Sequence, residues 1–419
     1  RERLLLSRPY LGDDGQPWEP SPFWADVVRL LGGQGEGEGP AWITRLTSAE
    51  ALPAERAASW PEALSALSQW VRAHEAPPEA AARALSHEPG ATRRVGGVLR
   101  GARPLAARLR PAPEGPFEGD CPSLRTALAH RYPAAKPWSA SRLESYLTCP
   151  FGFYLTHALG LQAPLEPAVG FDAAQLGTMC HAILELVCRR APGGSLAEML
   201  AALPGAAAEV LEEAPRRYGF RPSRHWEHEK QRIVEDLANT VHCLAGCSEG
   251  WRPLEMELVF GQGGSSLPAQ RLSAEEPATG KRIEFLLRGV VDRIDINAQG
   301  ELRVLDYKTG GDSIGPRDLL AGHRVQLALY AQAVQALLGR PVVEGFYWHI
   351  RAAKRSSLTL GSVDGGAERA MDIAVQRAHV AISAVLQGRF PPQPEGGACP
   401  AYCPGSAFCW RYSPPRSYR

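Results

Sequence analysis

Residues 289–310, GVVDRIDINAQGELRVLDYKTG, decide the fold of this chain. Apolar residues alternate on both sides of the turn-forming segment NAQG (297–300), which predicts two antiparallel strands joined by a hairpin. Asp292 lies near the middle of the first strand and Asp306 near the end of the second. Because the two residues lie at similar distances from the turn, we expect their carboxylates close together across the ladder.

Two facing carboxylates indicate a metal site. With a backbone carbonyl and waters they suit an octahedral Mg²⁺ ion, or Mn²⁺, because hard cations prefer oxygen ligands. Lys308 projects from the same face of the strand as Asp306, where an ammonium can orient or deprotonate an attacking water. The alternative is a solvated surface hairpin. The apolar run before Asp306, and a lysine count of five among 46 basic residues, favour the catalytic interpretation.

The other patterns predict an α/β domain with a mixed sheet flanked by helices. Ser139 caps a helix start, and Gln326 and Tyr330, four apart on one helix face, offer an amide and a phenol to a phosphate or a base. We expect helices at 173–190, 196–213, 225–247, 317–338 and 367–387, and strands at 254–260, 282–297, 301–308, 342–350 and 355–360. Residues 1–135 predict short helices (23–31, 61–74, 78–85) in Pro/Gly-rich linkers, and 136–419 the main domain.

Composition excludes several classes of protein. The 419 residues are 44% hydrophobic and 22% charged, with a formal net charge of +1, so the chain is not a globally basic nucleic-acid coat. It has no uncharged apolar stretch of ~18 residues and no secretory signal, so we expect a cytoplasmic protein without a membrane span. No phosphate-binding Gly-rich loop followed by Lys-Ser/Thr occurs, so we do not expect ATP hydrolysis by this chain.

The motifs Gly289-x-Val-Asp292, Leu-Asp306-Tyr-Lys308-Thr-Gly and Gln326-x₃-Tyr330 resemble the signature of RecB-type nucleases of the PD-(D/E)XK superfamily. The resemblance implies a restriction-endonuclease-like core. In it, Asp292 and Asp306 would be metal ligands, Lys308 would assist the nucleophile, and Gln326 and Tyr330 would position the strand.

The resemblance also implies a third metal ligand. RecB-type nucleases have a His in a Gly-x₃-His context on an earlier helix, and Gly177-x₃-His181 matches that context. Glu257 is a candidate for a further carboxylate, although Glu255 and Glu257 also fit the exposed face of an alternating strand.

Nine cysteines without a secretory signal favour metal ligation or core packing over disulfides. Cys399, Cys403 and Cys409 lie within eleven residues, and Cys149 is the candidate fourth thiol; zinc accepts four thiolates, but usually from two close pairs. The motif at 139–153, Ser-x-Ser-x-Leu-x₂-Tyr-x₂-Cys-Pro-x₂-Phe, resembles the start of AddB-type nuclease domains. That resemblance implies a [4Fe–4S] cluster on these four cysteines, with zinc as the alternative. Three residues separate Cys399 from Cys403, one more than the family spacing.

We therefore predict a metal-dependent DNA nuclease that hydrolyses phosphodiester bonds exonucleolytically. Residues 1–30 resemble the end of the helicase-like region of AddB-type subunits, which implies double-strand-break repair, single-stranded DNA at the site and an ATP-driven helicase–nuclease partner. One alternative is a free-standing cluster-containing exonuclease of CRISPR adaptation, about half this length. The other is a non-catalytic DNA-binding scaffold, against which the joint presence of His181, Asp292, Asp306 and Lys308 argues.

Overall fold

The computed structural model describes residues 6, 19–31, 62, 65–66, 69, 100, 115–162, 170–191, 194–310, 314–393, 399 and 403–412. The chain divides into two compact units, Arg1–Pro113 and Glu114–Arg419. In the first unit, helix α1 (Pro22–Leu30) begins at Ser21, whose hydroxyl accepts a hydrogen bond from the Trp24 amide. The helices predicted at 61–74 and 78–85 fall almost wholly outside the described residues. The predicted boundary at 135/136 stays a prediction.

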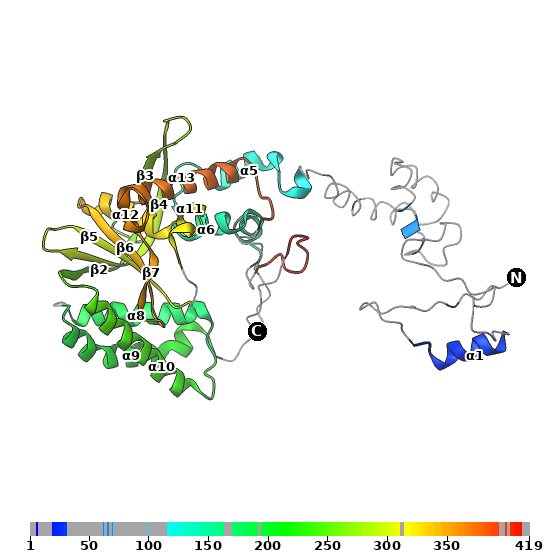
Figure 1. Cartoon of the computed structure of the whole chain (residues 1–419), viewed down its shortest axis with the longest axis horizontal. Coiled ribbons are helices and arrows are strands. Elements are labelled where there is room, and N and C mark those ends of the chain that lie inside the picture. The colour runs from blue at the N-terminus through cyan, green and yellow to red at the C-terminus, as the bar shows by residue number, and fades with distance from the viewer. Residues whose placement is uncertain are drawn as a thin grey trace. The chain divides into compact units, whose positions relative to one another are not determined.

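The second unit is built on a mixed seven-stranded sheet (Figure 1). Strand β4 is its centre: β2, β3 and β5 pair with it antiparallel and β1 pairs with it parallel. The sheet continues from β5 to β6 (parallel) and from β6 to β7 (antiparallel). The strands are β1 Trp138–Ser139, β2 Trp251–Phe260, β3 Gln270–Glu275, β4 Arg282–Asn297, β5 Leu302–Lys308, β6 Val342–His349 and β7 Lys354–Thr359.

Helices cover both faces of this sheet (Figure 1). One hydrophobic cluster packs the sheet against α6, α12 and α13, and a second packs it against α8, α9 and α10. Among the described residues, no helix is both long and apolar enough to cross a membrane. The helices are α5 Arg125–Arg131, α6 Ala140–Thr148, α7 Pro150–Phe153, α8 Ala173–Arg190, α9 Leu196–Tyr218, α10 Trp226–Gly246, α11 Pro316–Ala321, α12 Gln326–Leu338 and α13 Gly366–Leu386. Shorter turns are η2 Pro116–Glu118, η3 Pro122–Leu124, η4 Tyr154–Ala158 (a π-helix) and η5 Leu360–Ser362.

The predicted mixed α/β sheet and its hairpin are confirmed. Arg293 pairs with Leu305 and Ile296 with Leu302, and the Gly300 amide closes the turn on the Asn297 carbonyl. The prediction of one helix over 317–338 is wrong: Gly322 ends α11 with φ +96° and α12 begins at Gln326. Strand β3 was not predicted, because QRLSAE combines polar residues with weak strand formers.

The two strands beside the hairpin exchange faces at one position. In β2, Met256 packs with the α8–α10 cluster, whereas Leu258 packs with the α12–α13 cluster. In β4, Val291 belongs to the α12–α13 cluster, whereas the charge of Arg293 is felt by Cys188 of α8. Residues two apart in a regular strand share a face, so both strands switch faces between these residues, at Glu257 and at Asp292. Glu257 has φ +49°, a conformation rare outside glycine.

Candidate active site

Asp292 and Asp306 lie opposite one another in the β4–β5 ladder, since the register that pairs Arg293 with Leu305 continues to them. Both side chains are nearly buried, at 9% and 3% exposure. The Tyr307 amide donates to Asp292 Oδ2 at 2.7 Å, which fixes the carboxylate beside the end of β5. The expected proximity of the two acids across the ladder is therefore confirmed.

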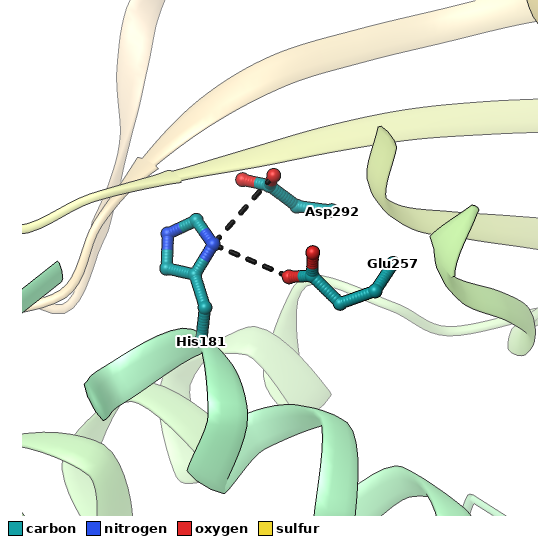
Figure 2. Close-up of side chains that lie close together, drawn as sticks. All are labelled: His181, Glu257 and Asp292. Carbon is teal, nitrogen blue, oxygen red and sulfur yellow. Dashed lines mark ion pairs between the residues drawn. The ribbon is translucent and has the colours of Figure 1, made fainter. Parts of the chain in front are cut away.

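His181 and Glu257 complete a cluster with Asp292 (Figure 2). His181 Nδ1 lies 3.3 Å from Glu257 Oε1 and 3.6 Å from Asp292 Oδ1. The ligand atoms of these three residues all lie within 4.8 Å of one another. An imidazole nitrogen and two carboxylates at this spacing can share one cation. The structure thus brings His181 to the predicted place and adds Glu257, for which alternation alone predicted an exposed strand face.

The position of α8 sets the orientation of the His181 ring. The helix begins with a capping box between Asp172 and Gln175 and crosses the end of β5, where His181 Nε2 lies 3.2 Å from the Tyr307 carbonyl oxygen. Because a carbonyl only accepts, Nε2 holds the proton of that contact. Nδ1 is therefore the nitrogen that faces the two carboxylates, and in the neutral ring its lone pair is available to a metal.

The charge of the site is strongly negative for its burial. Burial raises the pKa of Asp292, and the charge of Asp306 raises it further, to about 7. Burial alone would lower the pKa of His181, but the contact with Glu257 and the charges of the acids raise it to about 9. Three carboxylates and only one lysine therefore share this pocket of the fold. This donor set fits a divalent cation, which would neutralise the carboxylates without protonating them.

Lys308 links the acidic cluster to α12. Its ammonium lies 2.6 Å from Asp306 Oδ2 and donates to Gln326 Oε1 at 3.2 Å. Gln326 is the first residue of α12, and its backbone amide donates to Glu144 Oε1 on α6 at 2.9 Å. Lys308 and Gln326, both predicted from the motifs, are thus brought together. Glu144 was not predicted, and its only signal was its place in the 139–153 motif.

Tyr330 lies under the site and not at its mouth. The side chain is buried, it forms a hydrogen bond with the backbone of Val290, and its ring packs edge-on against Phe260. A Cβ on Gly289 would lie 2.6 Å from Tyr330 Cε1, so the glycine of the Gly-x-Val-Asp motif is needed for the ring to pack on β4. The geometry supports a role in holding the strand that presents Asp292.

The four candidate cysteines share one neighbourhood at the other end of α6. Cys149 begins α7, and Cys399 and Cys403 are buried. Burial raises the pKa of the Cys403 and Cys409 thiols, and negative charge on Cys149 and Cys399 raises both further. Phe151 of α7 packs against Trp410 at 5.9 Å between ring centroids. Four mutually interacting thiols are a donor set that fits a thiolate-bound metal centre.

Comparison with known proteins agrees with this geometry. A family model described as the PD-(D/E)XK nuclease superfamily matches residues 137–410. The chain is similar to proteins from three organisms that are named as the B-type subunit of an ATP-dependent helicase/deoxyribonuclease. For Moorella thermoacetica it is 33% identical over 238 residues, 52% of this chain and 19% of that protein. For Symbiobacterium thermophilum it is 31% identical over 229 residues, 49% and 18%. For Geobacillus thermodenitrificans it is 26% identical over 262 residues, 58% and 22%.

The chain spans about a fifth of the length of these relatives. The family match, in contrast, covers well over half of this chain and includes each of His181, Glu257, Asp292, Asp306 and Lys308. The resemblance to RecB-type and AddB-type nuclease domains is therefore confirmed at the level of the family. The chain belongs to the PD-(D/E)XK nuclease superfamily.

Proposed function

We propose that this chain hydrolyses phosphodiester bonds of DNA, with a divalent cation held by His181, Glu257, Asp292 and Asp306. The observation that supports the proposal most strongly is the convergence of His181, Glu257 and Asp292 within 4.8 Å, next to the Asp306–Lys308 pair. When bound, a Mg²⁺ or Mn²⁺ ion supplies Lewis acidity toward a phosphate oxygen and activates water.

Lys308 stabilises charge in this mechanism. Burial by itself would lower its pKa, but Asp306 and the other acids outweigh burial and raise it. The ammonium therefore keeps its proton at neutral pH, and it orients the attacking water and offsets the negative charge that grows on the phosphate. Deprotonation of the water by Lys308, the other possibility in the sequence, is disfavoured by the same shift.

Gln326 and Glu144 hold Lys308 in place. The Gln326 amide oxygen accepts from Lys308 Nζ, and Glu144 fixes the start of α12 through the Gln326 backbone. Tyr330 supports β4 from the opposite side of the ladder. In this arrangement the protein groups that face the reacting phosphate are already fixed before substrate binds, which lowers the cost of reaching the transition state.

The test is degradation of 5′-labelled single-stranded DNA in Mg²⁺ or Mn²⁺, with binding measured in EDTA as the second arm. Metal-dependent loss of full-length substrate supports the nuclease. Binding without cleavage in either metal would instead support the non-catalytic scaffold. Linear and circular single strands compared side by side test the exonucleolytic mode, because an exonuclease leaves the circle intact.

The biological setting follows from the relatives. They are named as subunits of an ATP-dependent helicase/deoxyribonuclease, and we propose that this chain works in the same kind of complex, in the repair of double-strand breaks. An ATP-driven partner would feed one strand to the site. ATP-dependent degradation of duplex DNA by the two subunits together, and by neither alone, is the expected result.

Cys149, Cys399, Cys403 and Cys409 would hold a [4Fe–4S] cluster that ties the first helices of the domain to its last segment. Among the described residues, which include all four cysteines, no three sulfurs form a group within 4.8 Å of one another. A tetrahedral zinc site holds its sulfurs about 3.8 Å apart, so the wider spacing favours the cluster. Iron, sulfide and zinc analysis of protein purified without oxygen distinguishes the two.

A further inference from the structure

Three arginines without an acidic partner lie beside the catalytic strand. Arg131 ends α5, Arg142 lies in the first turn of α6, and Arg288 lies in β4. Strand β1 joins them, because Ser139, which caps α6, pairs with Arg288 in the β1–β4 ladder. Within the part of the chain that the structure describes, none of these three guanidinium groups has a carboxylate within 4.0 Å.

The arginines are close enough to repel one another. Burial lowers the pKa of Arg142, and the charges of Arg288 and Arg131 lower it further, against an opposing effect of Tyr132. Arg142 Nε is buried and has no hydrogen-bond partner among the described residues. A buried donor without a partner inside a cluster of like charges is unfavourable in the free protein, and a bound anion would relieve both costs.

The cluster is also rigid. The Tyr132 ring lies under three cations: Lys136 Nζ at 5.5 Å, Arg131 at 5.9 Å and Arg142 at 6.0 Å from the ring centroid. Arg131 and the Tyr132 hydroxyl both donate to the His157 carbonyl. Guanidinium groups held by stacking and backbone contacts lose little freedom when they bind a phosphate.

The cluster shares its two supporting elements with the metal site. Arg288 precedes Asp292 by four residues on β4, a separation of about 13 Å along an extended strand. Arg142 precedes Glu144 by two residues on α6, and Glu144 fixes Gln326. An anion on the cluster is therefore held at a set distance from the reacting phosphate, as successive phosphates of one strand would be. A separate acidic protein partner would gain nothing from that distance.

We propose that Arg142 and Arg288, supported by Arg131, bind backbone phosphates of the same single DNA strand whose scissile phosphate lies at Asp292. The inference rests on the proposed nuclease function and specifies where the strand runs beyond the metal site. Arginine binds phosphate in a bidentate manner, and contacts to phosphates hold the strand without reading its sequence.

The experiment measures binding of a fluorescein-labelled oligothymidylate by the whole 419-residue chain in EDTA, over a series of salt concentrations. Each phosphate contact to a single strand contributes about 0.7 to the slope of log K against log salt. R142Q/R288Q is expected to reduce that slope by about 1.4 and to weaken Kd about tenfold, and R288Q alone by about half of that slope change. R142K/R288K is expected to keep the slope.

R340Q is the matched control, since Arg340 is exposed and lies beside Gly300, at the opposite end of β4. It removes the same charge and is expected to leave slope and Kd unchanged. A small diester, bis(p-nitrophenyl) phosphate, gives the second readout, because it cannot span the distance to the cluster. Its turnover is expected to be equal in R142Q/R288Q and wild type.

Equal slopes for R142Q/R288Q, R340Q and wild type would overturn the inference while leaving the nuclease proposal standing. It would also be overturned if turnover of the small diester fell together with DNA binding, since the arginines would then act through the structure of the site. Failure of the proposed function looks different: wild type itself would neither bind the oligonucleotide nor cleave either substrate.

Discussion

Glu257 lies opposite Asp292 across the β2–β4 ladder, at the position where both strands change the face they present to the core. The φ of +49° at Glu257 is unfavourable for a residue with a side chain. Strain of this kind persists where the surrounding structure imposes it, and it is concentrated at functional sites. Here it turns a strand residue toward His181 and joins a third carboxylate to the cluster.

Replacement of Glu257 by Gln tests that role directly. The amide keeps the shape but loses the charge, so we expect Mn²⁺ affinity, measured by calorimetry, to fall at least about tenfold. Glu255→Gln is the matched control, because Glu255 is exposed on the same strand. Equal affinities for the two variants would remove Glu257 from the ligand set.

Lys308→Met separates chemistry from metal binding. Loss of the ammonium should lower kcat on single-stranded DNA about 100-fold or more. Mn²⁺ affinity should stay the same or increase, since Asp306 loses its competing partner. Lys354→Met, at an exposed lysine of β7, should match wild type. A Lys308→Met protein with normal kcat would contradict the proposed mechanism.

Gly289→Ala should disturb the support of β4. The added Cβ would lie 2.6 Å from the Tyr330 ring, and overpacking of this kind lowers the free energy of unfolding by about 1–3 kcal/mol. Thermal and denaturant unfolding measure the loss. Gly246→Ala, where an added Cβ meets nothing within 4 Å, should be nearly neutral. If both substitutions had the same small effect, the contact would not matter to stability.

Cys403→Ser should remove or destabilise the proposed cluster. We expect loss of iron and sulfide from protein purified without oxygen, together with a lower melting temperature, because metal binding and folding are coupled. Cys243→Ser, at an exposed thiol of α10, should keep both. Full metal content in the Cys403→Ser protein would exclude this thiol as a ligand.

The sequence was sufficient for the parts of the site that depend on regular geometry. A hairpin register follows from turn and alternation, so Asp292 and Asp306 could be paired from the sequence. His181 could not be placed by periodicity, because its contact with Tyr307 depends on how α8 crosses β5. It came from the resemblance alone.

Glu257 shows where sequence reasoning stops. An alternating strand predicts an exposed side chain there, and only the positive φ turns it into the site. The break between α11 and α12 has a similar cause. Gly322 takes a left-handed conformation inside a run whose apolar spacing continues across it. Backbone conformations of single residues are set by tertiary contacts that composition and periodicity do not encode.

The most direct test of the account is the rate at which Asp306→Asn protein degrades labelled single-stranded DNA in Mn²⁺, beside wild type and Asp318→Asn. Asp318 caps α11 through the Gly315 amide, so its replacement is a carboxylate control outside the cluster. The account predicts metal-dependent degradation by wild type and Asp318→Asn and a loss of at least about 100-fold for Asp306→Asn, which lacks a metal-binding carboxylate. Degradation by Asp306→Asn at the wild-type rate would contradict it.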